Sequence, residues 1–85
     1  MPKSIRSSGL LELGKAVAEH RMKKGMSQRE FAASVGYRQS RISKIELGLR
    51  RLDIVEFIVL ARVMGVDAAW LLNRIEAAVP SDHRI

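Results

Sequence analysis

Four glycines divide most of this chain into short stretches, and this punctuation constrains the fold more than any other sequence feature. Each glycine directly follows a segment in which apolar residues recur at helical spacing: Gly25, Gly36, Gly48 and Gly65. Glycine commonly ends a helix because it adopts the left-handed backbone conformation at little cost. No segment shows the apolar–polar alternation that predicts a strand. The sequence therefore predicts an all-α single domain of five short helices with short connections.

Capping residues mark the starts of three of these helices. Ser27-Gln28-Arg29-Glu30 is a capping box, in which Ser27 caps the helix and Glu30 reaches back to the Ser27 N–H. Asp53 and Glu56 resemble a second box, and Asp67 is a third cap. The predicted helices run from about Leu10 to Lys24, from Ser27 to Val35, from Arg38 to Glu46, from Asp53 to Met64, and from Asp67 to a point before Pro80.

Apolar residues at helical spacing predict the face that each helix buries. These residues are Leu10, Leu13, Val17 and Met22 in the first helix; Phe31, Ala32 and Val35 in the second; Ile42 and Ile45 in the third; Phe57, Leu60, Ala61 and Met64 in the fourth; and Trp70, Leu71, Leu72 and Ile75 in the fifth. The folded domain is predicted to span residues 9–79. Residues 1–8 are expected to form a flexible N-terminal arm and residues 80–85 a loose C-terminal tail.

The chain's charge indicates a polyanionic partner. The net charge is +6 over 85 residues, which favours nucleic acid first and an anionic membrane surface second. The basic residues cluster in the middle of the chain, where Glu46 alone opposes them: Arg38, Arg41, Lys44, Arg50 and Arg51.

Other classes of protein are disfavoured by what the sequence lacks. A domain of 85 residues has little room for a catalytic cleft, and no nucleophile–base cluster or phosphate-cradling glycine loop is present, so we expect no enzyme activity. No apolar run suits a membrane span or a secretion signal. The chain has no cysteine, which excludes disulfides and thiolate metal sites and fits a cytoplasmic protein. His20 and His83 have no plausible ligand partners, so we expect no metal and no cofactor.

Residues 28–47 carry the most informative pattern. Two short helices meet at a turn centred on Gly36, and Ala32 is small where one helix must cross closely over the other. Val35 and Ile42 are apolar where this pair must be buried. Two helices that meet steeply across a tight turn form the helix-turn-helix unit.

From about Leu10 to Ile75 the sequence resembles the lambda-repressor/Cro-type family of helix-turn-helix regulators, also called the XRE family. The resemblance is carried by Met26-Ser27-Gln28-Arg29-Glu30-Phe31-Ala32, Val35-Gly36, Ser40-Arg41-Ile42-Ser43-Lys44-Ile45-Glu46-x-Gly48, Leu60-Ala61-x-x-Met64-Gly65-Val66 and Trp70-Leu71-Leu72. It implies a five-helix lambda-repressor-like domain that binds double-stranded DNA, usually as a homodimer on a near-palindromic operator, with the third helix in the major groove.

The third helix supplies the candidate base-reading residues. With Ile42 and Ile45 inward, its polar residues point outward, and Gln39 projects from the helix start. Glutamine pairs bidentately with adenine, serine adapts to several bases, and lysine favours guanine acceptors. The residue chemistry and the resemblance both favour Gln39, Ser40 and Lys44, with Ser43 as a weaker fourth candidate.

A second set of residues is predicted to bind phosphate. The N-terminus of the second helix favours an anion, and the family places a glutamine there that holds the DNA backbone and braces the base-reading glutamine. The phosphate candidates are Gln28, Tyr37, Arg38, Arg41, Arg50 and Arg51. Tyr37 departs from the family by occupying the position expected to cap the third helix, and its hydroxyl is predicted to face a phosphate.

The resemblance implies two further features. Arg21 and Glu46 are expected to form an internal ion pair that orients the third helix. Trp70, Leu71 and Ile75 are the expected dimer surface on the fifth helix.

The leading functional hypothesis is a sequence-specific transcriptional regulator, acting as a repressor or autoregulator. A restriction–modification controller protein is one specific form of it. The alternative is the antitoxin of a toxin–antitoxin pair, which would bind a toxin as well as its own promoter. The short tails leave little chain to cover a toxin.

Overall fold

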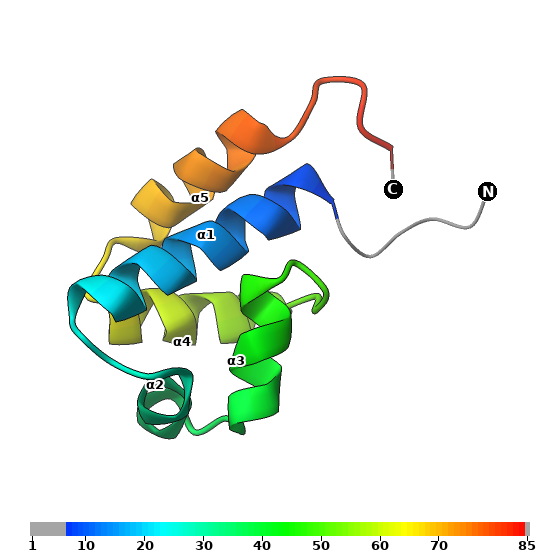
Figure 1. Ribbon diagram of the computed structural model, residues 1–85. Coiled ribbons are helices and arrows are strands. Elements are labelled where there is room, and N and C mark those ends of the chain that lie inside the picture. Colours follow the sequence, from blue (N-terminus) through cyan, green and yellow to red (C-terminus); the bar gives the residue numbers. More distant parts are fainter. Residues whose placement is uncertain (1–6, 85) are drawn as a thin grey trace.

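The computed structural model describes residues 7–84, and that part of the chain contains five helices and no strand. The helices are α1 (Ser8–Lys23), α2 (Gln28–Val35), α3 (Gln39–Glu46), α4 (Ile54–Met64) and α5 (Ala68–Ala78). α1 runs between α5 on one side and α3 and α4 on the other, and α2 packs against α3 away from α5 (Figure 1). The predicted all-α, five-helix architecture is confirmed. None of these helices in residues 7–84 is both long enough and apolar enough to cross a membrane.

The predicted helix caps are present. The Ser27 N–H donates to Glu30 Oε1 at 2.8 Å and the Glu30 N–H donates to Ser27 Oγ at 3.0 Å. Asp53 and Glu56 form the same reciprocal pair at the start of α4, and Asp67 Oδ1 accepts from the Ala69 N–H. Gly36 ends α2 with φ of 81°. Residues that have a Cβ rarely adopt this left-handed backbone conformation. It turns the chain sharply between α2 and α3.

Two helix starts differ from the prediction. α1 begins at Ser8 rather than at Leu10, because Ser7 Oγ accepts a hydrogen bond from the Leu10 N–H at 3.2 Å. Ser7 and Ser8 therefore cap and begin a helix instead of forming part of an arm, and residues 1–6 of the predicted arm lie outside the described residues. The N-cap of α3 is Arg38, not Tyr37, and it makes no side-chain capping hydrogen bond.

The core consists of side chains from every helix. The buried apolar residues are Leu13, Ala16, Val17, Phe31, Ala32, Ile42, Ile45, Leu60, Ala61, Met64 and Leu71. The prediction was wrong for three residues assigned to buried faces. Met22, Trp70 and Leu72 are 60%, 51% and 57% exposed. At roughly 100° per residue, Met22 lies about 140° around the helix from Val17, outside the buried stripe.

Gly14 lies on α1 where that helix crosses closely over the end of α3. A Cβ added there would lie 2.5 Å from the Ile45 carbonyl oxygen and 2.6 Å from that of Glu46. α1 therefore crosses the C-terminal end of α3 at a separation that only glycine permits. This crossing fixes the depth at which α3 sits against the body of the domain.

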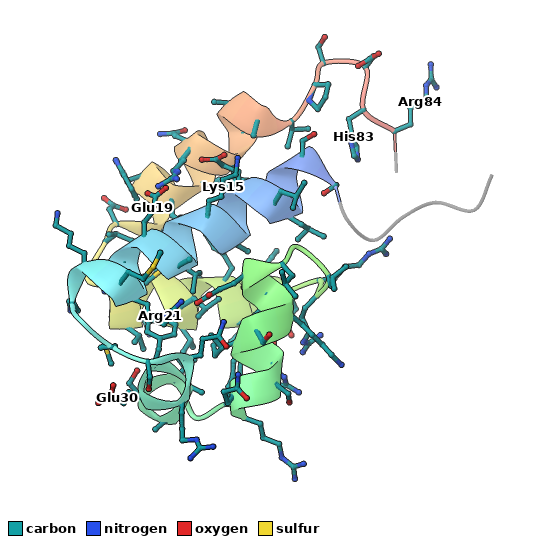
Figure 2. All side chains as sticks on the ribbon, in the orientation of Figure 1. Lys15, Glu19, Arg21, Glu30, His83 and Arg84 are labelled. Atoms are coloured by element: carbon teal, nitrogen blue, oxygen red, sulfur yellow. The ribbon has the colours of Figure 1, made fainter. Side chains whose placement is uncertain are left out.

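Charged side chains fasten α5 to α1. Arg74 Nε donates to Glu12 Oε2 at 2.7 Å, and its Nη1 and Nη2 donate to the two carboxylate oxygens of Glu19 at 3.0 and 2.9 Å. The hydrogen bonds with Glu19 and then Glu12 raise the pKa of Arg74, and the bond from Arg74 lowers the pKa of Glu19. Figure 2 shows Glu19 on the part of α1 that lies beside α5.

Candidate nucleic-acid interface

The polar side of α3 faces solvent while its other side is anchored in the core. Ile42 and Ile45 have almost no exposed surface. Gln39, Ser40 and Lys44 are exposed, and Ser43 is half-buried at the edge of the same surface. The helix thus presents three of the four predicted base-reading side chains fully to an outside partner, and Ser43 only partly.

A chain of hydrogen bonds leads from Gln39 into the domain. Gln39 Nε2 donates to Gln28 Oε1 at 2.7 Å, and Gln28 Nε2 donates to Glu46 Oε1 at 3.0 Å. Arg21 Nε and Nη2 donate to the same carboxylate at 2.7 and 3.0 Å. These hydrogen bonds, from Gln39 through Gln28 and Glu46 to Arg21, are called the relay below. The relay joins the starts of α2 and α3, the end of α3, and α1.

The Glu46 carboxylate gives this relay its direction. An ionised carboxylate only accepts hydrogen bonds, whereas each glutamine amide has a donor end and an acceptor end. Glu46 requires the NH2 group of Gln28, so the oxygen of Gln28 turns towards Gln39. Gln39 must then offer one amide hydrogen to Gln28, and it keeps its oxygen and second hydrogen for another partner. That pair matches the donor and acceptor on the major-groove edge of adenine.

Arg21 holds Glu46 in place from the end of α1. Arg21 points from α1 towards α2 and α3 (Figure 2), and the side chains of Arg21 and Glu46 are only 15% and 8% exposed. Arg21 Nη1 also donates to the Met26 carbonyl oxygen at 3.0 Å. The hydrogen bond with Glu46 raises the pKa of Arg21. The pair expected from the sequence is thus a largely buried, bidentate contact.

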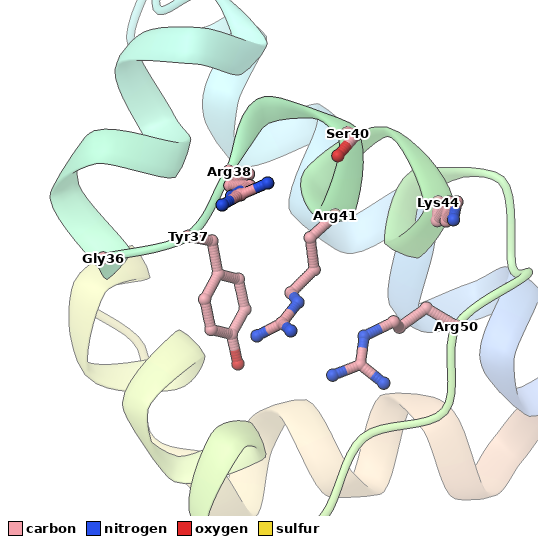
Figure 3. A pocket seen from close by; sticks show the side chains of 7 residues that line it. All are labelled: Gly36, Tyr37, Arg38, Ser40, Arg41, Lys44 and Arg50. Carbon is pink, nitrogen blue, oxygen red and sulfur yellow. The ribbon is translucent and has the colours of Figure 1, made fainter.

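A basic pocket lies beside the polar face of α3. Its volume is about 410 Å³. It is lined by the side chains of Tyr37, Arg38, Ser40, Arg41, Lys44 and Arg50. Figure 3 shows the Arg41 guanidinium between the Tyr37 ring and the Arg50 guanidinium. The Arg41 guanidinium carbon is 4.7 Å from the ring centroid, within the range of a cation–π contact. The structure therefore gathers four of the predicted phosphate-binding residues, while Arg51 is exposed outside the pocket.

The Tyr37 hydroxyl does not face outward as the sequence suggested. It donates to Glu56 Oε2 at 2.7 Å, and burial together with that bond raises the pKa of Tyr37 to about 12. The reason is that Glu56, at the start of α4, supplies an acceptor next to the ring. The Tyr37 ring can flank a phosphate in the pocket, but its hydroxyl hydrogen is already used.

The predicted dimer surface does not form one patch. Leu71 is wholly buried in the core, and Ile75 is half-buried. Trp70 is exposed, but at roughly 100° per residue it lies about 160° around α5 from Leu72. Adjacent helix positions point in different directions, so the three residues predicted for one surface lie in three different environments: Trp70 in solvent, Leu71 in the core and Ile75 at its edge.

An apolar groove lies instead between the start of α1, the start of α4 and one side of α5. Its volume is about 740 Å³. The small residues Gly9, Ala68 and Ala69 line it together with the larger Ile54, Leu72 and Val79. Ile54 and Leu72 are 78% and 57% exposed. Ile75 is the one predicted dimer residue among the residues that line this groove.

Sequence reasoning gave Glu56 only a capping role and therefore missed its place beside the basic pocket. Its Oε2 accepts from Tyr37 and from Arg50 Nη2, the latter at 3.1 Å. The hydrogen bond from Tyr37 and then that from the Asp53 backbone lower the pKa of Glu56. Its proximity to residues nineteen and six positions away depends on how α4 docks, and no local motif reports that. In residues 7–84, no three side chains of the types that bind metals lie close enough together to hold an ion.

Comparisons with known proteins agree with the helix-turn-helix arrangement of α2 and α3. The family model described as helix-turn-helix matches residues 17–71, which run from the middle of α1 to the first turn of α5. An XRE-family like protein from Pseudomonas syringae pv. tomato is 39% identical, with a TM-score of 0.67 over 85% of this chain and 88% of that one.

Two other solved structures are similar. The restriction–modification controller protein C.AhdI from Aeromonas hydrophila is 29% identical, with a TM-score of 0.66 over 73% of this chain and 90% of that one. The clp gene regulator ClgR from C. glutamicum shares the fold at 23% identity, with a TM-score of 0.69 over 86% and 96% of the two chains. No curated protein sequence matches this chain.

Proposed function

Because this chain belongs to the XRE-type helix-turn-helix family of DNA-binding transcription regulators, we propose that two copies bind one near-palindromic operator and act there as a repressor or autoregulator. Helix α3 enters the major groove of each half-site. The observation that carries this proposal is the exposed Gln39, whose amide is oriented by the relay through Gln28 to Glu46. In a bacterial cell such a protein works in the cytoplasm, where the chromosome is.

In this proposal Gln39 reads adenine, and Ser40 and Lys44 read neighbouring base pairs. An oriented amide binds adenine without first losing side-chain freedom, and it presents the wrong pattern to the other bases. Ser43 contributes less because it is half-buried. Sequence discrimination therefore depends mainly on Gln39, Ser40 and Lys44.

The basic residues hold the DNA backbone. Arg38, Arg41 and Arg50 line the pocket and flank one phosphate there, and the exposed Arg51 adds positive charge next to Arg50 in the chain. Gln28 contributes through its backbone, because the first N–H groups of a helix have no partner within the helix. Its side chain is already engaged at both ends by Gln39 and Glu46. These contacts set affinity and register rather than sequence preference.

The experiment that tests this function is the substitution Gln39→Ala. We expect it to weaken binding to the preferred duplex by roughly 1–3 kcal/mol, and to leave binding to a scrambled duplex unchanged, because only the base contact is lost. Fluorescence anisotropy with both duplexes at one salt concentration measures the two affinities. Equal losses on both duplexes would show that Gln39 does not read a base.

We propose that the apolar groove is the homodimer surface, in place of the group that includes Leu71 and Trp70. A twofold dimer places the same patch of each copy against the other. Leu72 of one copy can then fill the space above the small residues Ala68 and Ala69 of the second. Ile54 and Ile75 extend the apolar area on either side. The groove is a better candidate than Trp70 because its exposed side chains are contiguous.

Leu72→Glu is expected to abolish dimerisation, since the twofold axis would bury two new charges in one apolar contact. The dimer dissociation constant should rise by at least about 100-fold, the effect of roughly 2.7 kcal/mol. Sedimentation velocity measures it, with Asn73→Glu as the control because it adds the same charge at the adjacent, exposed position. If Trp70→Ala dissociates the protein and Leu72→Glu does not, the surface lies on the other side of α5.

A restriction–modification controller is the specific role that the similarity to C.AhdI favours. The match covers 90% of the length of that protein and 73% of this chain. If the role is correct, the preferred duplex will occur upstream of genes for a restriction endonuclease and its methyltransferase.

A further inference from the structure

One oxygen of Glu56 gathers the side chains that form a wall of the basic pocket. Oε2 accepts the Tyr37 hydroxyl at 2.7 Å and Arg50 Nη2 at 3.1 Å, and it lies 3.9 Å from Arg41 Nη1. The two arginines come from α3 and from the loop after it, whereas Glu56 belongs to α4. A single carboxylate oxygen therefore connects three segments at the edge of the candidate interface.

Glu56 is itself held rigidly. Its Oε1 accepts from the Asp53 N–H at 3.1 Å, and its own N–H donates to Asp53 Oδ1 at 2.7 Å. Its side chain is 21% exposed. The capping box thus fixes the carboxylate relative to α4. The carboxylate in turn holds Arg50 and Arg41 relative to the same helix.

The arginines remain able to bind an anion while they contact Glu56. Arg50 uses one N–H for Glu56 and another for the Arg51 carbonyl oxygen at 3.0 Å, whereas a guanidinium has five N–H donors in a rigid fork. Arg41 is stacked on the Tyr37 ring, which leaves the edge of its guanidinium available. With Arg38 and Lys44, the pocket brings four cations together against one carboxylate.

We propose that Glu56 is a positioning residue, which orders Arg41 and Arg50 before DNA arrives so that the pocket accepts one backbone phosphodiester. This inference rests on the proposed DNA-binding function and assigns an acidic residue, Glu56, a part in binding the phosphate. Arginine loses much side-chain freedom when it is fixed, so prior ordering removes a cost that binding would otherwise carry. The negative charge of Glu56 itself repels DNA, and the two effects therefore predict opposite outcomes for its removal.

The test is Glu56→Gln, measured on the preferred and the scrambled duplex. Glutamine also completes a capping box, so α4 keeps its start. If positioning dominates, binding weakens by about fivefold on both duplexes, the size of one partly exposed ion-pair contact. The salt dependence also becomes shallower by about one phosphate contact. Tighter binding by the variant would overturn the proposal, since it would show that Glu56 only repels DNA.

A control and a double-mutant cycle make the assignment specific. Asp67→Asn removes the same charge at the start of α5 and keeps a capping residue, so it should not weaken binding. In an Arg50→Ala background, Glu56→Gln should weaken binding by less than about twofold, because only Arg41, which lies farther from the carboxylate, remains for Glu56 to position. An undiminished effect there would contradict positioning.

Tyr37→Phe is a second test of the positioning role, and it leaves the Glu56 carboxylate in place. It removes the hydroxyl donor to Glu56 and keeps the ring under Arg41. We expect a loss of about twofold on both duplexes, and no change would count against the proposal. If the unmodified protein binds no duplex, the DNA-binding function fails. If it binds and Glu56→Gln does not weaken it, only this inference fails.

Discussion

Gly14→Ala is expected to destabilise the domain by about 3 kcal/mol or more and to abolish DNA binding with it. The added methyl group would lie within 2.6 Å of two backbone carbonyl oxygens at the end of α3. Overpacking usually costs about 1–3 kcal/mol, but flexible side chains relieve much of that strain. Backbone atoms of a helix cannot move alone, so α1 and α3 must separate. A domain of 85 residues has roughly 4–13 kcal/mol of total stability.

Gly9→Ala is the matched control for this substitution, because it makes the same change in the same helix. A Cβ at Gly9 would meet side-chain atoms and no backbone, the nearest being Val79 Cγ2 at 3.0 Å and Ile75 Cγ2 at 3.4 Å. Alanine also favours helix by up to about 1 kcal/mol relative to glycine. Urea unfolding should leave Gly9→Ala within about 1 kcal/mol of the unmodified protein. A similar small change for Gly14→Ala would contradict the close crossing of α1 and α3.

Glu46→Gln is expected to lower both stability and sequence discrimination. It leaves the largely buried Arg21 guanidinium without its counter-charge, and breaking a buried pair costs roughly 3–5 kcal/mol. We expect the lower end of that range, because both side chains retain some exposure. The midpoint of thermal unfolding should fall by about 12–24 °C. Glutamine at position 46 offers a donor as well as an acceptor, so Gln28 no longer has to present its NH2 group, and the amide of Gln39 could turn either way.

Glu76→Gln removes the same charge from an exposed position on α5 and serves as the control. It should change neither the unfolding midpoint nor the affinity ratio between the preferred and scrambled duplexes. The two readouts for Glu46→Gln separate stability from orientation, provided that binding is measured well below its unfolding midpoint. A variant that unfolds early but discriminates normally would show that the relay does not orient Gln39.

Local sequence signals predicted the helices because the interactions that start and stop helices are themselves local. Ser27 and Glu30 are three residues apart, and Gly36 ends α2 through its own backbone conformation. The start of α1 was placed two residues late because Ser7 was assigned to an arm, although serine is a good cap. Arg38 was harder to predict as an N-cap, since it contributes no capping side chain.

The site was predictable where one helix face decides it. Ile42 and Ile45 fix which side of α3 is buried, and that leaves Gln39, Ser40 and Lys44 outside. The contacts of Glu56 and the crossing at Gly14 were not predictable in this way. Both depend on how helices distant in sequence dock, and neither residue type signals such a contact by itself. The burial of Leu71, which the sequence assigned to the dimer surface, was unpredictable for a related reason, since helical spacing does not tell which apolar positions belong to the core.

The claim on which everything else depends is that the polar face of α3 reads duplex sequence. Selection of bound sites from a random double-stranded library, at moderate salt and with the unmodified protein, tests it most directly. We expect one enriched sequence, near-palindromic, with adenines in half-sites about 34 Å apart, one turn of duplex. Recovery of unenriched, unrelated duplexes after repeated rounds would mean that this face does not recognise sequence.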